Sequence, residues 1–106
     1  MSGKKYDNGK TMYHLLPYEA LEQVARVMMF GAKKYGINNW RGGMKHSRLW
    51  DAALRHLVAT RNGESHDSET SLLHTAHAAC CVLFLLSYQL LNIGDNDLGF
   101  DYEEPE

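Results

Sequence analysis

The sequence contains little that would crosslink or sharply bend the chain, because only 2 of its 106 residues are cysteine and 2 are proline. The cysteines, Cys80 and Cys81, are adjacent within an apolar stretch. Neighbouring residues on a helix point in different directions, so these two thiols cannot readily form a disulfide with each other. A disulfide-stabilised secreted scaffold is therefore not expected, and a reducing cytoplasm is the expected setting.

Long apolar runs and recognisable leader or nucleotide motifs are also missing. The longest apolar run, residues 78–91, is shorter than the ~20 residues that a membrane-spanning helix needs, and polar side chains interrupt it. The N-terminus shows no signal-peptide pattern. Neither a Walker loop nor a dinucleotide-binding fingerprint occurs. We expect a soluble protein without a membrane partner.

Acidic residues are missing from one long stretch of the sequence, and basic residues are missing from another. Residues 23–50 contain no acid and six Lys or Arg, whereas residues 95–106 contain no base and six of the thirteen acids. Without that acidic tail, seven acids face eleven Lys and Arg residues. The folded part of the chain is therefore positive and suited to an anionic ligand, although the formal net charge of the whole sequence is −2.

Apolar residues recur with helical spacing, and no segment alternates with period two. The pattern predicts three long helices, over about 18–35, 47–61 and 69–92, with Ser47 as the N-cap of the second. The third is apolar on nearly all sides, which is typical of a helix buried in a bundle or dimer interface.

These elements predict an all-α fold, a small bundle of three main helices over residues 1–93. Residues 94–106 form an acidic tail for which we expect little fixed structure. A core of this size is marginal for a chain of 106 residues. We therefore expect a homo-oligomer that completes the bundle.

A polar loop followed by two histidines is the most informative stretch. Glu64, Asp67 and Glu69 lie in the loop, and His74 and His77 follow in the third predicted helix. A spacing of three residues places both imidazoles on one helical face, and carboxylates with imidazoles suit divalent metals. The alternative is that the acids cap the helix and the histidines are hydrogen-bonded core residues.

Two further residues could complete such a site. Glu22 would add a fourth carboxylate if it faced inward, but it could equally pair with Arg26 one turn along the helix. His56, in the middle of the second predicted helix, either belongs to the site or packs against aromatic side chains. Carboxylate clusters of this kind bind Mg²⁺ or Mn²⁺, which neutralise phosphate oxygens and orient water.

Cations, aromatics and amides gather where the first predicted helix ends. Lys34, Tyr35, Asn39, Trp40 and Arg41 could grip phosphates and stack on a nucleobase. Equally, they could be a charged helix end with a packing tryptophan. The residues alone thus favour a small helical, metal-dependent hydrolase of phosphoesters or phosphoanhydrides.

An ordered set of short motifs between residues 5 and 91 carries a family resemblance. The set comprises Gly9-Lys10, Leu21-Glu22, Phe30 to Tyr35, Asn39-Trp40, Arg55-His56, Gly63-Glu64, Asp67, Glu69, His74 and His77. It resembles the phage dATP/dGTP diphosphohydrolases, which are similar to the MazG-like all-α nucleoside triphosphate pyrophosphohydrolases. The resemblance implies a helical, oligomeric enzyme that uses Mg²⁺ or Mn²⁺ to cleave a purine deoxynucleoside triphosphate into the monophosphate and pyrophosphate.

The resemblance also implies roles for individual residues. Metal ligands would be Glu22, Glu64, Asp67, His74 and His77, with Glu69 or His56 as the base or as a group that orients water. Phosphates would be balanced by Lys34, Arg41 and Arg55, and the base or sugar would contact Tyr35, Asn39 and Trp40. The Glu19/Glu22 and Glu64/Asp67 pairs match the metal motifs of the wider superfamily by residue type but lie further apart, and His74 with His77 could take the place of the second motif.

Two other functions remain open from the sequence. An HD-type phosphohydrolase would use His56, His66-Asp67 and Asp95 or Asp97. A small helical nucleic-acid-binding protein would use the cationic stretch between residues 26 and 48, although this leaves the acids and paired histidines unexplained. Nucleic acid is therefore not the expected partner.

Overall fold

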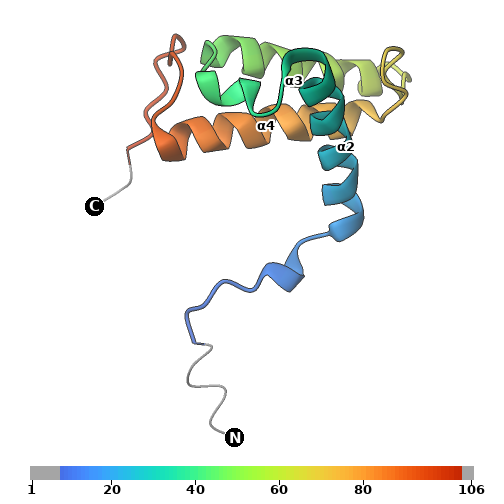
Figure 1. Ribbon diagram of the computed structural model, residues 1–106. Coiled ribbons are helices and arrows are strands. Elements are labelled where there is room, and N and C mark those ends of the chain that lie inside the picture. The colour runs from blue at the N-terminus through green and yellow to red at the C-terminus, as the bar shows by residue number, and fades with distance from the viewer. Residues whose placement is uncertain (1–7, 104–106) are drawn as a thin grey trace, which may run out of the picture.

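The structure, a computed structural model, describes residues 8–103. Its three α-helices are α2 (Tyr18–Tyr35), α3 (His46–Arg61) and α4 (His74–Leu91), and its short 3₁₀ helices are η1 (Tyr13–Leu15) and η2 (Asn39–Gly42). Helices α3 and α4 lie side by side and antiparallel, while α2 crosses the N-terminal half of α4 (Figure 1). Apart from two isolated bridges, residues 8–103 form no β-structure, so the predicted all-α bundle is confirmed.

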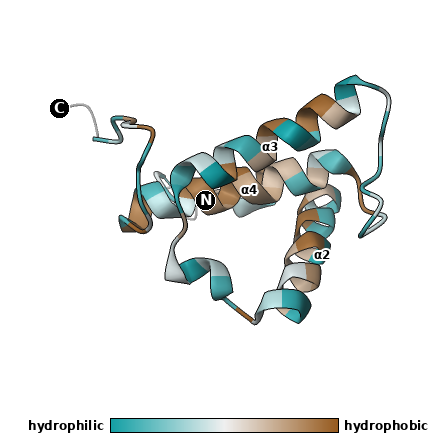
Figure 2. Ribbon diagram, turned by 90° about the horizontal axis from the view of Figure 1, so that it is seen from above, coloured by the Kyte–Doolittle hydropathy of each residue, from teal (hydrophilic) through white to brown (hydrophobic). Residues whose placement is uncertain are grey.

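Small and branched apolar side chains hold the three helices together. Val24 and Val27 of α2 pack against Ala76 and Cys80 of α4. Leu49 and Ala53 are the buried apolar residues of α3. Small side chains at the crossing let the helix backbones approach closely, and Figure 2 shows how apolar residues alternate with polar ones along α2 and α3. The core is thin, and it lies between the helices.

Helix α2 has the predicted bounds, whereas the start of α3 differs from the prediction. The N-cap of α3 is Lys45, and Ser47 lies inside the first turn. Ser47 donates its backbone N–H at 2.9 Å and its hydroxyl to the carboxylate of Asp97. The prediction that Ser47 caps α3 is therefore wrong, because a carboxylate fifty residues later satisfies the free N–H group.

Helix α4 begins at His74, five residues later than predicted. A turn around Asp67 holds the preceding segment, since one carboxylate oxygen accepts bonds from the backbone N–H groups of Glu69 and Thr70, each at 3.0 Å. Ser71 then adopts a left-handed conformation with φ of +61°. An α-helix cannot run through a non-glycine residue in that conformation without cost. The acids thus lie in a structured loop ahead of the helix.

The acidic tail has more fixed structure than expected as far as residue 103. The carbonyl of Asp95 accepts the backbone N–H of His46 at 2.8 Å, and Phe100 packs edge-on against Trp50 with 5.5 Å between ring centroids. Gly94 has a φ of +81°, and an added Cβ would lie 2.5 Å from the carbonyl oxygen of Met44. Only glycine fits this approach. Residues 1–7 of the predicted helical domain and residues 104–106 of the predicted tail lie outside the described residues.

Helix α4 is apolar enough, and at 18 residues long enough, to cross a membrane by length and composition. The core helix of a soluble protein meets the same test. Here α4 packs against both other helices and begins with the buried His74. Only 28% of its length is buried, however, so many of its apolar side chains lie on the surface.

Candidate metal and nucleotide site

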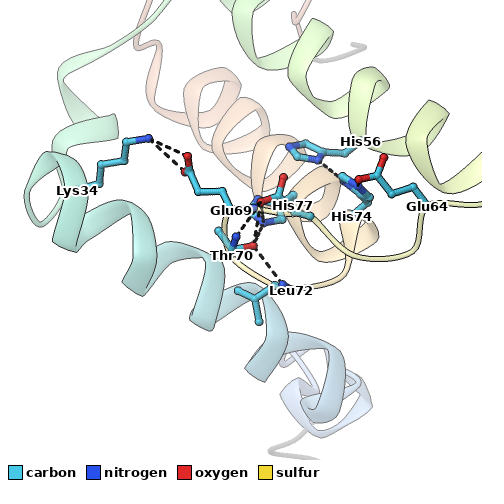
Figure 3. A network of polar contacts seen from close by, with 9 residues as sticks. Lys34, His56, Glu64, Glu69, Thr70, Leu72, His74 and His77 are labelled. Carbon is cyan, nitrogen blue, oxygen red and sulfur yellow. Dashed lines mark hydrogen bonds and ion pairs between the residues drawn. The ribbon is translucent and has the colours of Figure 1, made fainter.

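The antiparallel pairing of α3 and α4 brings together residues that are far apart in the sequence. His56, near the end of α3, meets His74 and His77 in the first turn of α4. The loop between the two helices adds Glu64 and Asp67 to the same place. Figure 3 shows the rings of His56 and His74 facing each other, with Glu64 beside His74 and His77 close by. Four of the five predicted metal ligands therefore gather around His56.

His56 and His74 form the centre of this cluster. Their Nδ1 atoms are 2.8 Å apart, so one proton must lie between them. His74 is only 5% exposed, and its other nitrogen, Nε2, is buried without a hydrogen-bond partner. A carboxylate oxygen of Glu64 lies 3.5 Å from Nε2 but forms no hydrogen bond with it. A buried polar atom without a partner is costly unless another group binds it.

Asp67 presents a carboxylate in a fixed orientation. Three donors reach the same oxygen, Oδ2: the N–H groups of Glu69 and Thr70, and the Thr70 hydroxyl at 3.3 Å. Burial raises the pKa of Asp67, but the bonds donated by Thr70 and Glu69 and the nearby His77 outweigh it, so the net pKa is lowered. Asp67 is therefore ionised, and among the described residues no hydrogen bond engages its other oxygen.

His77 links the cluster to its surroundings. Its Nε2 lies 2.7 Å from the Thr70 hydroxyl, and its ring stacks on His56 with 4.6 Å between centroids. Burial lowers the pKa of His77 and also that of His56, where the other two imidazoles lower it further. Both rings are thus neutral near pH 7, which is the form that can bind a metal.

The residues present fit a divalent cation. His56, Asp67 and His74 each offer a ligand atom, and these three atoms lie within 4.8 Å of one another. A metal held by nitrogen and oxygen at ~2.0–2.2 Å would need only a small closure of this group. With a metal on Nδ1, the other nitrogen of His74, Nε2, would carry its N–H beside the Glu64 carboxylate, 3.5 Å away.

A pocket of about 530 Å³ opens beside the cluster. The end of α2, the 36–44 segment and α4 form its walls, and its lining includes the predicted residues Tyr35, Asn39 and Trp40. His77 belongs to both the pocket and the histidine cluster. Ligand pockets commonly have volumes of ~300–1,000 Å³, so a nucleotide-sized molecule fits.

Some residues predicted for the site are engaged elsewhere. Glu22 pairs with Arg26 at 2.9 Å on the exposed side of α2, which is the alternative that the sequence allowed. Trp40 packs on Phe84 with ring centroids 4.6 Å apart, and the Arg41 guanidinium lies 4.5 Å from the Trp40 ring. Trp40 thus lines the pocket as a packed residue, because its ring is already in contact with these two groups.

Lys34 and Glu69, predicted as a phosphate ligand and a base, contact each other. The ammonium lies 3.2 Å from the carboxylate and joins the end of α2 to the loop before α4 (Figure 3). This bond is the main reason that the pKa of Lys34 is raised. Arg55 is exposed on α3, and its charge acts on Cys81, which lines the pocket.

The sequence patterns missed three residues at the site. Thr70 supports both Asp67 and His77, and Arg48 and Phe84 line the pocket. The helical pattern places Phe84 seven residues, two turns, after His77, and this spacing could have identified it. Thr70 had no such signal, because its role depends on the turn around Asp67.

The residues of the HD-type alternative do not all come together. His66 bonds to its neighbour Ser65, and Asp97 caps α3 at the opposite end from His56, so the His…His-Asp…Asp set of an HD site is not brought together. In the cationic stretch, Arg26 and Lys34 are paired with carboxylates and Arg48 lines the pocket.

Comparison with known proteins shows the family of the chain. Residues 1–97 match the family described as dATP/dGTP diphosphohydrolase, N-terminal. The chain belongs to this family. It is also 44% identical over 92 residues to a protein of Salmonella phage PMBT28 named dATP/dGTP diphosphohydrolase. That alignment covers 87% of this chain but only 31% of the phage protein, so the chain spans about a third of its relative. No solved structure shows significant similarity to the chain.

Proposed function

We propose that this domain hydrolyses purine deoxynucleoside triphosphates, dGTP or dATP, to the monophosphate and pyrophosphate. The observation that carries the proposal is the shared position of His77, which lies in both the pocket and the histidine–carboxylate cluster. A nucleotide whose base occupies the pocket would therefore place its phosphates at the cluster. Membership of a family described by this activity supports the same assignment.

In this proposal the pocket holds the base and sugar. Tyr35 and Asn39 line it, and the Asn39 amide can both donate and accept hydrogen bonds to a base edge. Arg48, also in the lining, is placed to neutralise a phosphate on the same nucleotide. Trp40 shapes the wall through its contact with Phe84.

The cluster holds the phosphates and the attacking water. A divalent metal ion would be held by His74 and Asp67 with Glu64 nearby, and when bound it would supply charge neutralisation. Lys34 exchanges its contact with Glu69 for a phosphate oxygen, and Arg55 adds a second positive charge. The freed Glu69 carboxylate takes a proton from water as the water oxygen bonds to phosphorus and the α–β bridging oxygen leaves with pyrophosphate.

The predicted homo-oligomer is part of the same proposal. On α4, Val82, Leu83, Leu86 and Leu90 are exposed, at spacings that form one stripe along the helix. On α3, Leu54, Leu57 and Val58 are also exposed. An apolar stripe on one helix can pair with its own copy across a two-fold axis. A second copy would therefore bury these residues, in the host cytoplasm if the chain is phage-encoded.

Product analysis tests the proposed activity directly. The protein is incubated with each deoxynucleoside triphosphate and Mg²⁺ or Mn²⁺, and the products are separated by ion-exchange chromatography. We expect dGMP or dAMP with pyrophosphate in equal amounts. His74→Gln should abolish the reaction, while Glu22→Gln, which alters an exposed carboxylate outside the cluster, should retain it. Release of inorganic triphosphate, or no turnover of any substrate, would contradict the proposal.

A further inference from the structure

The donor atoms of the cluster differ from those of a typical magnesium site. Mg²⁺ prefers oxygen ligands and keeps several waters, whereas imidazole nitrogen suits Fe²⁺, Co²⁺ and Zn²⁺. Here the three groups that converge are two imidazoles and one carboxylate, His56, His74 and Asp67. We propose that these residues bind a transition-metal ion of the Fe²⁺, Co²⁺ or Zn²⁺ class, with Mn²⁺ weaker, and that Mg²⁺ does not occupy this site.

The first support is the pair of facing Nδ1 atoms, together with a buried His74 nitrogen, Nε2, that has no hydrogen-bond partner. A neutral imidazole has one N–H and one lone pair, so the facing Nδ1 atoms of His56 and His74 use a single proton. If His74 supplies it, Nε2 is a buried lone pair whose nearest charged neighbour is the Glu64 carboxylate, 3.5 Å away. If His56 supplies it, the N–H on His74 Nε2 is buried and unsatisfied. A cation bound by both Nδ1 atoms would replace the shared proton, and His74 Nε2 would then carry its N–H beside the Glu64 carboxylate, a contact one layer outside the ligands.

The second support is the fixed orientation of the groups around the pair. The turn at residues 67–72 holds Asp67 through three donors on one oxygen, which leaves the other oxygen for a ligand. His77 is held by the Thr70 hydroxyl at 2.7 Å and packs its ring on His56. Contacts of this kind, one layer outside the ligands, fix ring orientation and raise metal affinity.

His56 is then a metal ligand, because its Nδ1 faces His74 Nδ1. A nitrogen that binds the ion cannot also take a proton from water, so His56 is not the base. The catalytic role of this ion rests on the proposed function, whereas the binding of the ion follows from the cluster alone. Mg²⁺ can still accompany the triphosphate into the pocket. The two ions would then have separate roles, one fixed in the protein and one carried by the nucleotide.

Metal binding can be measured on the full chain without nucleotide. After chelator treatment, Co²⁺ is added and its visible absorption bands, which appear on binding to imidazole nitrogen, are followed; calorimetry measures Mn²⁺, Zn²⁺ and Mg²⁺. We expect one Co²⁺ or Zn²⁺ per chain and Mg²⁺ binding weaker by at least about 100-fold, following the preference of imidazole for the former ions. Mg²⁺ binding as tightly as Co²⁺ would overturn the proposal.

Matched variants locate the site. His74→Gln and Asp67→Asn should each weaken Co²⁺ binding by at least about tenfold, whereas His66→Gln and Glu22→Gln, which alter exposed residues outside the cluster, should leave it unchanged. In the unmutated protein, imidazole ¹⁵N resonances of His56 and His74 should shift on adding Zn²⁺, and those of His14 and His66 should not. Shifts confined to His14 or His66 would overturn the proposal. Because this measurement uses the unmutated protein, it does not depend on whether the variants fold.

The two proposals fail in distinguishable ways. Co²⁺ bound through His74 without hydrolysis of any deoxynucleoside triphosphate contradicts the proposed function and supports this inference. Hydrolysis supported by Mg²⁺ alone, in protein whose histidines bind no metal, supports the function and overturns the inference.

Discussion

Two buried histidines at opposite ends of the α3–α4 pair show the difference between a structural residue and a candidate ligand. His46 is 3% exposed and His74 is 5% exposed. Both nitrogens of His46 have partners, with Nδ1 3.2 Å from the Tyr102 hydroxyl and Nε2 2.9 Å from the Ile93 carbonyl oxygen. His74 faces a second imidazole on one side and has no hydrogen-bond partner on the other.

The comparison shows that burial alone does not mark a functional histidine. His46 joins the tail to α3 in an arrangement that satisfies its hydrogen-bonding capacity. The arrangement around His74 stays incomplete and lies beside a carboxylate and a pocket. An unsatisfied group of this kind is expected where a protein gives up stability for binding.

The largest expected effect comes from exchanging each histidine for leucine. His74→Leu should lower kcat by at least about 100-fold because a metal ligand is lost. Its metal-free stability should fall by no more than about 1 kcal/mol, since Nε2 has no partner and only the single bond between Nδ1 and the half-buried His56 is lost. Steady-state kinetics and urea unfolding measure the two quantities.

His46→Leu should show the reverse pattern. It leaves the Ile93 carbonyl without its partner, so we expect a loss of about 1–3 kcal/mol in the free energy of unfolding. The kcat of the folded fraction should be unchanged, because His46 lies at the other end of α3. Equal loss of kcat in the two variants would remove the distinction between the two histidines.

Asp67→Asn is expected to have the next largest effect. Asparagine keeps a carbonyl oxygen for the Glu69 and Thr70 N–H groups, so the turn should survive. The negative charge at the cluster is lost, and kcat/KM should fall by about 10–100-fold. Circular dichroism would check that the helix content is retained, and an unchanged kcat/KM in folded protein would exclude Asp67 as a ligand.

The pH dependence of stability sharpens the comparison further. The pKa values of His56 and His77 are lowered in the folded protein, mainly by burial. As pH falls below about 6.5, the unfolded chain takes up protons first, so the metal-free protein should lose stability from there down through the folded pKa values. Thermal unfolding between pH 8 and 5 tests this, and His56→Gln should flatten the profile.

The smallest effect is expected at Glu22. Glu22→Gln breaks an exposed ion pair with Arg26, worth about 0.3–0.5 kcal/mol for a pair one helical turn apart. Activity and metal affinity should match the unmutated protein within error. A large loss of kcat would place Glu22 in the site, across a subunit interface or after a rearrangement of α2.

The periodic parts of the fold could be predicted from sequence, and the parts set by long-range contacts could not. The apolar spacing from Tyr18 to Tyr35 defined α2, which the structure confirms. The start of α3 depends on Asp97, and the tail depends on His46 and Trp50, so neither had a local signal. The start of α4 moved because the side chain of Asp67 stabilises a turn that competes with the helix.

The location of the site was easier to predict than the roles within it. The spacing of His74 and His77 indicated a shared face, and the structure adds Asp67 and Glu64 from the loop. That His56 faces His74 depends on the register between α3 and α4, which helical periodicity does not define. The pairing of Glu22 with Arg26 was one of two arrangements that the spacing allowed.

A crystal structure of the protein with Co²⁺ and a purine deoxynucleoside triphosphate analogue, made non-hydrolysable at the α–β bridge, tests the central claim most directly. The account predicts an anomalous cobalt peak at about 2.0–2.2 Å from nitrogens of His56 and His74 and an oxygen of Asp67. It also predicts the purine in the pocket beside Tyr35 and Asn39. A peak beside Glu19 and Glu22, or a nucleotide bound away from His77, would contradict it.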